Sequence, residues 1–507
     1  MTETDLINAK ISFMGRGRTP KEITQSILDE YRKGEKRQDV LDMLEADEYF
    51  LCRNTAISEK ERGYMGADGQ WRTNETLSNA KVPAGFLRSN VLQKVNYSVG
   101  KPFTLTIDGP IEDAVDEATG EKVIDPLKEQ YSQEWLTWAD ANRRKTLKRI
   151  VRDGVNKGKG WAYVSIIDGD LEIEDNEPAQ TYPAWTDKPH TILDALVYEY
   201  IQIQYDGTQR KEVRKVDFYT PDGVDRFVDD GGLDYDPDHQ GVEAHMSRET
   251  KDGVQNISWG RVPFIALKGN EDELPMLNVI RQQIDAYDAL QSKSVDALVD
   301  DIDPVLVVEN ISPEMGDLTK ARQSIQNARI VSLDKDGKAY YVQVNPDISA
   351  IQTKLETLRK DIREFGSAVD TQDVKFGSNP SGVALKSMYQ DLDIYVNGLE
   401  TEIEVFFQSL KYFFDIWLQF KGVGTADQWS GYKLTVTLDR DMMINTSADI
   451  QETVMLMSTG VSTETLDNWN PAVESHEIEQ QRREREQNSQ LDQMKVFRQQ
   501  AGQEEDA

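Results

Sequence analysis

The chain has 507 residues and a formal net charge of −32 at pH 7, from 90 acidic and 58 basic residues. This length is enough for two to four structural modules. Tight binding to nucleic acid is disfavoured, because such binding depends on Lys and Arg neutralising phosphates. An acidic wall could still keep a passing duplex from sticking, but the charge alone favours the simpler view that acidity aids solubility.

Cys52 is the only cysteine, so no internal disulfide can form and a reducing compartment is compatible with the chain. No apolar run approaches the roughly 18 residues of a membrane span. The first residues, Met-Thr-Glu-Thr-Asp, lack the basic-then-apolar pattern of a signal peptide. We therefore expect a protein that is made and kept in a cytoplasm unless another assembly exports it, without membrane contact.

Helices are predicted to dominate the first part of the chain, after a flexible N-terminus over residues 1–19. Thr19, Pro20 and Glu22 supply an N-cap, a proline at the first helical position and a capping-box glutamate. The helix that starts there is followed by further predicted helices over 38–52, 84–99 and 127–155. A short strand is predicted over 103–107.

The hydrophobic period changes to two between Gly158 and Phe264, which is typical of strands. Asp-Gly turn signals separate the candidate strands. We therefore predict an antiparallel β region embedded between helical segments. Its strands are expected at 161–167, 171–173, 195–204, 213–219, 224–228 and 254–259.

Long amphipathic helices follow. One is predicted over 275–301, with these side chains inward: Leu277, Ile280, Ile284, Tyr287, Leu290 and Leu298. Two more run from Pro346 to Phe420 and are joined by a polar loop over 371–382. Apolar residues in both alternate spacings of three and four, which keeps one stripe on one side, with Phe365 and Val369 ending the first stripe.

A small α+β insertion is predicted over 304–345. Its hairpin has strands at 330–333 and 339–344, joined by a turn at Asp334, Lys335, Asp336 and Gly337. A strand is predicted at 432–438 and short helices at 447–459 and 462–468. From Ser475 onward the sequence is charged and predicted to be helical, and it ends in the acidic residues 504–506.

The apolar stripes have two interpretations. For a single helix, ordinary core packing is the usual one. Here several such helices are long, and residues 383–420 alone would span about 57 Å. Helices of that length need partners along the whole stripe, so neighbouring subunits can supply them, and a ring is one closed solution.

Motifs for catalysis or metal binding are weak. The four histidines show no zinc spacing, and no nucleophile elbow or phosphate-binding loop is present. The run from Asp234 to His239 resembles the start of a calcium loop, but Gly and the closing Glu are missing, which favours an acidic surface loop. We predict no catalytic residue, no metal and no cofactor.

One dense basic cluster lies in the predicted helix over 127–155 and just beyond it. It could contact nucleic acid, but in so acidic a chain we favour pairing with acidic neighbours or an adjacent subunit. Its members are Arg143, Arg144, Lys145, Lys148, Arg149, Arg152, Lys157 and Lys159.

The order of several segments resembles the portal proteins of tailed bacteriophages, of the siphophage type. Each motif is weak alone, but their order and spacing from about residue 20 to 485 are fairly specific. The segments that carry the resemblance are Asn90–Pro102, Asp217–Val224, Gly260–Ile265 followed by Ile284–Ser292, Phe376–Leu385 and Thr459–Leu466.

The resemblance implies an α+β, mainly helical portal-type fold with wing, stem, clip and crown regions that closes into a ring, usually a dodecamer. Residues 20–274 with 383–440, a long helix and return strand, would form the wing, and 275–301 and 346–370 the two stem helices. Residues 302–345 would be the clip and 371–382 the tunnel loop. Residues 441–507 would be the crown, although its last residues look too polar to pack.

The resemblance also implies roles for residues. The tunnel loop would face DNA through Asp373, Val374, Lys375, Phe376, Gly377, Ser378 and Asn379. Subunits would pack through the stem at Ile284, Tyr287, Leu355, Leu358 and Ile362. The clip would dock motor and adaptor near Asp334, Lys335, Asp336 and Gly337. For Lys375, an exposed loop residue without a role is as good an interpretation.

The implied function is a ring at one capsid vertex through which double-stranded DNA is packaged and ejected. The implied partners are DNA, further copies of the chain, the terminase large subunit, a head–tail adaptor, the scaffold and the major capsid protein. The implied location is the virion, with the host cytoplasm during assembly. The alternatives are a metal-dependent nuclease or phosphotransferase with an unidentified carboxylate cluster, and a scaffold or adaptor without a channel.

Overall fold

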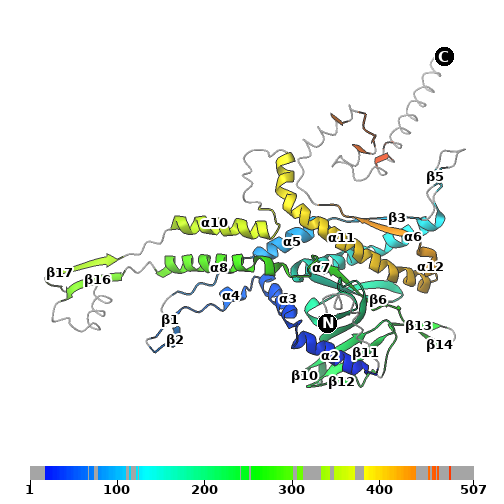
Figure 1. The fold of residues 1–507 in the computed structure, drawn as a ribbon, viewed down its shortest axis with the longest axis horizontal. Helices are drawn as coiled ribbons and strands as arrows, with labels where there is room; N and C mark the ends of the chain where they lie inside the picture. The colour runs from blue at the N-terminus through cyan, green and yellow to red at the C-terminus, as the bar shows by residue number, and fades with distance from the viewer. Residues whose placement is uncertain are drawn as a thin grey trace, which may run out of the picture. The chain divides into compact units, whose positions relative to one another are not determined.

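The computed structural model describes residues 17–440, except for 67, 74–77, 110–113, 116–121, 124, 240, 251–252, 301–304, 312–332, 343–347 and 371–381. Beyond 440 it describes 455–456, 460–463, 465–466, 479–480 and 483. Helices and antiparallel sheets alternate along the chain (Figure 1), so the predicted α+β class is confirmed. The chain divides into two compact units. One comprises Met1–Ala368 with Val396–Asp439, and the other Val369–Tyr395 with Arg440–Ala507. Among the described residues, no helix is both long enough and apolar enough to cross a membrane.

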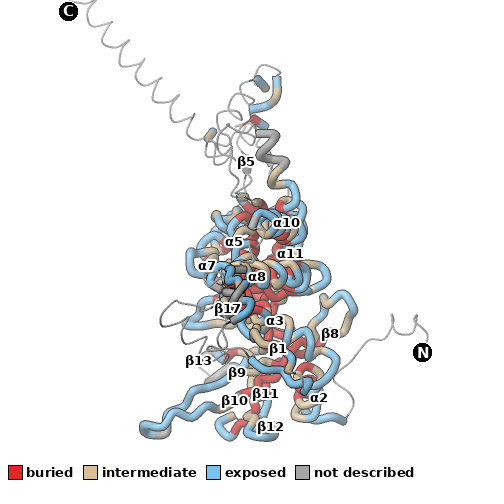
Figure 2. Tube along the Cα trace, turned by 90° about the vertical axis from the view of Figure 1, so that its left-hand side faces the viewer, coloured by how far each residue is buried: buried red, intermediate tan, exposed pale blue. Residues whose placement is uncertain are grey.

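Helix α2 (Pro20–Arg32) begins at the predicted capping box, in which the Thr19 hydroxyl accepts from the amide of Glu22. Its apolar face, with Ile27 and Leu28, packs on one side of a five-stranded antiparallel sheet. The order of the strands in that sheet is β12 (Leu233–Tyr235), β11 (Val224–Asp229), β10 (Gln209–Tyr219), β9 (Leu193–Asp206) and β8 (Thr181–Trp185). Figure 2 shows the outer part of the β9–β10 hairpin as exposed, away from this core.

A second antiparallel sheet has the order β15 (Phe264–Lys268), β6 (Lys159–Ile167), β7 (Asp170–Asn176). Strand β13 (Met246–Thr250) pairs with β14 (Gly253–Ile257). Four of these strands were not predicted from the sequence: β8, β12, β13 and β15. The smaller pairs are β1 (Gly63–Met65) with β2 (Trp71–Thr73), β3 (Thr104–Asp108) with β18 (Lys433–Thr437), and β4 (Ala114–Val115) with β5 (Lys122–Val123).

The helix predicted over 127–155 is two helices, α6 (Pro126–Trp138) and α7 (Ala141–Lys157). The break has a local cause, because the Asp140 side chain caps α7 by accepting from the amide of Arg143 at 2.8 Å. The apolar residues before and after Asp140 keep the same helical spacing, so the sequence pattern alone did not reveal the break.

An aromatic core lies where α6 meets α11 (Gly382–Lys421) and α12 (Ala426–Trp429). Phe414 stacks on Trp135 with ring centroids 3.8 Å apart, and Tyr131 stacks on Trp429. Lys411 and Asp415 are buried in this core as an ion pair, and the Tyr131 hydroxyl donates to Asp415. The predicted stripe of α11 is thus core within the chain over residues 399–418.

Helix α8 (Met276–Asp300) is contacted by α7 and by three further helices: α3 (Arg37–Phe50), α4 (Thr55–Ser58) and α5 (Phe86–Val99). Helix α10 (Ile348–Phe365) lies beside α8 (Figure 1). Strands β16 (Val305–Ile311) and β17 (Leu333–Val342) follow α8 and precede α10, and they pair antiparallel.

Candidate assembly site around helices α8 and α10

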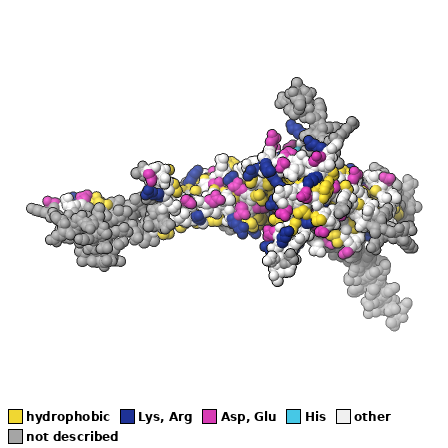
Figure 3. Space-filling view, turned by 90° about the horizontal axis from the view of Figure 1, so that it is seen from below, with side chains coloured by type: hydrophobic (Ala, Val, Ile, Leu, Met, Phe, Trp, Pro, Cys, Tyr) yellow, Lys and Arg dark blue, Asp and Glu magenta, His cyan; other side chains and the backbone are white. Residues whose placement is uncertain are grey.

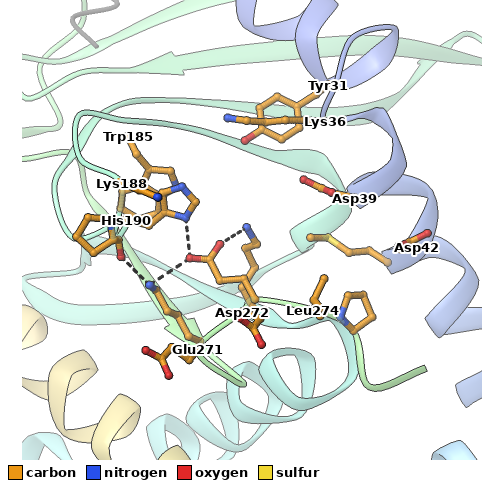
Figure 4. A pocket seen from close by; sticks show the side chains of 16 residues that line it. Tyr31, Lys36, Asp39, Asp42, Trp185, Lys188, His190, Glu271, Asp272 and Leu274 are labelled. Carbon is orange, nitrogen blue, oxygen red and sulfur yellow. Dashed lines mark hydrogen bonds and ion pairs between the residues drawn. The ribbon is translucent and has the colours of Figure 1, made fainter. Parts of the chain in front are cut away.

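Glu273 lies in the loop before α8 and fixes this loop to the neighbouring β-sheet region. Its carboxylate accepts from Lys159 Nζ and His190 Nδ1, both at 2.7 Å, and pairs with Lys268 Nζ at 3.2 Å (Figure 4). Burial by itself would raise the pKa of Glu273, but the His190 and Lys159 contacts hold it far below its usual range. The loop that feeds α8 is therefore anchored to β6, β15 and the segment after β8.

A cavity of about 310 Å³ lies beside this anchor, as Figure 4 shows. Charges of both signs line it, including Lys36, Lys188, Asp39 and Asp42. Within the described parts of the chain, no group of three or more His, Cys, Asp or Glu could hold a metal ion. The mixed lining does not select one class of ligand.

The first half of α8, Met276–Tyr287, is packed as a core helix. Leu277, Ile280 and Ile284 are at most 1% exposed. Polar contacts at the edge fix its rotation: the Tyr49 hydroxyl of α3 donates to Asp285 at 2.6 Å. The apolar residues that recur every three or four positions in this half are the ones that are buried, as the sequence predicted.

The second half of α8, Asp288–Asp300, buries polar side chains instead. Asp288, Ser292 and Asp296 are at most 3% exposed and accept hydrogen bonds from the backbone of an extended segment. The amide of Ala84 donates to Asp288 at 2.9 Å, that of Val82 to Ser292 at 3.1 Å, and that of Ala80 to Asp296 at 2.6 Å. We call this set, with its three amide donors, the polar clamp.

The spacing of the polar clamp has a geometric reason. Four helical residues rise about 6 Å, and two extended residues advance about 6.6 Å. Side chains at every fourth helix position therefore match amides at every second residue of the segment that contains Ala80, Val82 and Ala84. The clamp gives this extended segment the acceptors that a neighbouring strand would otherwise supply.

The pKa of Asp288 is affected by its position in the clamp. Burial raises the pKa of Asp288 to about 6, against the opposing hydrogen bonds from Asn54 and Ala84. At the other end of the clamp, Asp296 also pairs with Lys60 at 3.4 Å and Arg62 at 3.8 Å.

The end of α10 is held by side chains of α5. Lys94 is fully buried, and its ammonium donates to the carbonyls of Gly366 and Ser367. Asn90 donates to the carbonyl of Ile362 and accepts from Arg363. Burial, with the Arg363 charge nearby, lowers the pKa of Lys94 to about 7. Helix α10 ends at Phe365 rather than near Val369 as predicted, because Ser367 takes φ 45° and the amide of Ala368 turns back to donate to the carbonyl of Arg363.

The predicted hairpin at 330–344 is wrong in topology. Residues 333–342 form one strand, β17, which pairs with β16 rather than folding back at 334–337. Asp334, Lys335, Asp336 and Gly337 bulge between the pairs Glu309↔Lys338 and Ile311↔Leu333. Asp336 has φ 67°, so the local turn chemistry was detected, but it makes a bulge rather than a hairpin turn.

The predicted stem residues fall into two groups. Ile284, Leu358 and Ile362 are buried within the single chain, whereas Tyr287 and Leu355 keep partly exposed side chains. Their role between subunits stays a prediction. Leu298, predicted to point inward, is 56% exposed, so that prediction is wrong. Phe365, on the predicted apolar stripe of α10, is 49% exposed in the single chain. The tunnel-loop residues 373–379 lie outside the described residues.

The basic cluster on and after α7 is largely paired, as favoured from the sequence. Its members find acidic partners within the chain: Arg143 with Glu172, Arg149 with Asp175, Arg152 with Asp153, Lys157 with Asp47 and Glu177, and Lys159 with Glu273. Figure 3 likewise shows acidic and basic side chains interspersed over the face in view. These five side chains therefore make no dedicated nucleic-acid surface.

Sequence reasoning missed the polar clamp, Lys94 and Glu273. The clamp had a signal, because Asp288, Ser292 and Asp296 recur at a spacing of four and so lie on one side of the helix. Lys94 and Glu273 gave none, since a lone charged residue is normally exposed.

Comparison with known proteins identifies the family. A family model described as phage portal protein, SPP1 Gp6-like, matches residues 29–491. The chain belongs to this family. Membership makes it a phage portal protein, which is a structural component of the virion capsid.

Individual relatives agree with the family. The portal protein of Bacillus phage SPP1 is 26% identical over 455 residues, covering 88% of this chain and 84% of the relative. The portal protein of Clostridium phage phiCD119 is 24% identical over 435 residues, covering 82% and 85%. A chain from a structure described as the neck of an empty GTA particle computed with C6 symmetry is 11% identical. It has a TM-score of 0.37 and covers 75% of this chain and 87% of that one.

Proposed function

We propose that copies of this chain close into a ring at one vertex of the capsid, and that double-stranded DNA is packaged and ejected through its centre. Family membership supports the proposal. The observation that carries it is the α8–α10 pair, which is anchored at the Glu273 loop and at the end of α10, yet leaves apolar side chains of α8 exposed in the single chain. A helix pair that is held in place and exposes apolar side chains is suited to packing against another copy of the chain.

The regions keep their predicted roles in this proposal. Residues 275–301 and 346–370 form the stem, 302–345 the clip, and 371–382 the tunnel loop that faces DNA. Residues 20–274 with 383–440 form the wing, and 441–507 the crown. The clip docks the terminase large subunit and later the head–tail adaptor, with scaffold and major capsid protein contacting the ring, which we expect to be a dodecamer.

The charge of the chain supports passage of DNA rather than capture. At −32 per copy, a ring repels phosphates, and strong phosphate contacts would stall a sliding polymer. The pairing of the α7 cluster with acidic residues points the same way. The nuclease alternative needs converging carboxylates, and the described residues offer no such group to favour it.

The purified chain tests the proposal directly. Negative-stain imaging and mass photometry should show closed rings with an open centre. If only single copies are found across protein and salt concentrations, the ring is refuted. In a packaging assay with the phage motor, deletion of 374–380 should leave ring yield unchanged and impair DNA uptake. Unchanged uptake would remove this loop from the mechanism.

A further inference from the structure

Two small apolar surfaces of one chain are left uncovered. The first is on the hairpin of β1 and β2, where Met65 and Trp71 are 63% and 52% exposed. These two residues are direct cross-strand partners, so their side chains stand on the same face of the hairpin. We call them the hairpin face.

The second surface is on the second half of α8. Val295, Leu298 and Val299 are 37%, 56% and 52% exposed. Their spacing of three and four residues places them on one side of the helix. We call them the helix face.

Both faces lie at the same height along α8. The base of the hairpin is tied to Asp296, which pairs with Lys60 and Arg62 and accepts from the amide of Ala80. Ser78 adds a hydrogen bond to the Asp296 carbonyl. Since Asp296 lies within the helix face in sequence, the hairpin leaves α8 at the level of Val295 and Leu298, and Figure 1 shows β1–β2 below this end of the helix.

The two faces do not cover each other within one chain, since all five side chains remain exposed. The polar clamp holds the hairpin base at Asp296. Val295 and Val299 lie next to the clamp residues on the helix surface and Leu298 lies farther round the helix, yet all three stay exposed in the single chain. An isolated two-stranded hairpin is marginal in water. An uncovered cross-strand Met–Trp pair at its free end therefore indicates a contact with another surface.

We infer that the hairpin face of one copy packs on the helix face of the next copy. The inference rests on the proposed ring. Cyclic symmetry joins two different patches of neighbouring copies and keeps each at its own height along the axis. A protruding apolar pair and an apolar helix face at equal height on the same subunit meet that requirement. The contact would explain why α8 keeps apolar residues outward beyond its core.

Single-cysteine crosslinking tests this contact. Cys52 is the only native cysteine, so a Cys52→Ala background removes competing thiols. One preparation carries Trp71→Cys and a second, distinguishable by a tag, carries Leu298→Cys. After mixed assembly and mild oxidation, a crosslinked heterodimer is expected, because the two thiols lie on different copies. Met65→Cys with Val295→Cys gives an independent pair if one variant folds poorly by circular dichroism.

The matched control pairs Trp71→Cys with Lys293→Cys, which is exposed at the same height on another side of α8. We expect several-fold less heterodimer from the control. Rings that form normally but give no heterodimer above the control overturn the contact and leave the ring intact. An intramolecular disulfide in a chain carrying both Trp71→Cys and Leu298→Cys also overturns it. Absence of rings refutes the contact and the proposed function together.

Discussion

The two halves of α8 use one helix in opposite ways. In the first half the apolar residues, such as Ile280 and Ile284, are buried and the polar residues lie at the edge. In the second half Asp288, Ser292 and Asp296 are buried, while Val295, Leu298 and Val299 are exposed. Burial of a helix side is therefore decided by what lies against it: side chains in the first half, and the bare backbone of an extended segment in the second.

The difference has a simple energetic reason. An extended segment brings amides that need acceptors, and the buried carboxylates and hydroxyl of the clamp supply them. Apolar side chains cannot serve as acceptors, so they face outward in this half. The changes below test this division, from the largest expected effect to the smallest.

Ile284→Ala should have the largest effect. Removing a fully buried side chain leaves a cavity, and we expect about 3 kcal/mol loss in the free energy of unfolding. Urea unfolding followed by tryptophan fluorescence measures it. Val279→Ala, in the same half but 57% exposed, is the control and should change the value by less than about 0.5 kcal/mol. Equal effects of the two changes would contradict the assignment of a core half.

Asp296→Ala should come next. The change leaves the amide of Ala80 without its acceptor, and Lys60 and Arg62 without their shared partner. We expect the free energy of unfolding to fall by about 2 kcal/mol. The readout is hydrogen exchange, which should accelerate at residues 80–84. Ser294→Ala, whose hydroxyl only bonds within its own helix, serves as control. Unchanged exchange in the Asp296 variant would show that the clamp does not hold this segment.

Asp288→Asn should change the pH dependence. The folded pKa of Asp288 is raised to about 6, so the folded state holds a proton that the unfolded state has already lost between about pH 4 and 6. The contribution of this group to stability is therefore full below about pH 4 and is lost as pH rises through 6.

The amide introduced by Asp288→Asn can be accommodated if the Asn54 side chain turns its unpaired Oδ1 toward it. The measurement is urea unfolding at several pH values. Relative to the variant, the natural chain should lose stability as pH rises from about 4 to about 7. A constant difference over that range would show that Asp288 titrates normally.

Val299→Ala should have the smallest effect on a single chain. The side chain is 52% exposed, so the free energy of unfolding should change by less than about 0.5 kcal/mol. Ring yield in mass photometry should fall if the helix face is covered by a neighbour. A large loss of stability in the isolated chain would mean that this residue is packed internally.

Sequence patterns predicted the elements that depend on local rules. The capping box at Thr19 starts α2, and alternating apolar residues gave β6, β9, β10 and β11 close to their observed bounds. Short or irregular strands such as β12 and β15 were missed, because their few residues carry little periodicity. The turn residues at 334–337 were recognised, but only the pairing of β17 with β16 decides that they form a bulge.

By itself, the sequence determined the acidic charge, the mixture of helices with an antiparallel β region, the long amphipathic helices and the resemblance to portal proteins. These follow from composition, period and segment order, which are properties of the chain as written. The tertiary structure alone decided which side of α8 is buried, how side chains of α5 hold the end of α10 and where Glu273 finds its three nitrogen partners. Each of these depends on groups distant in sequence that meet only when the chain folds, and no local pattern records such a meeting.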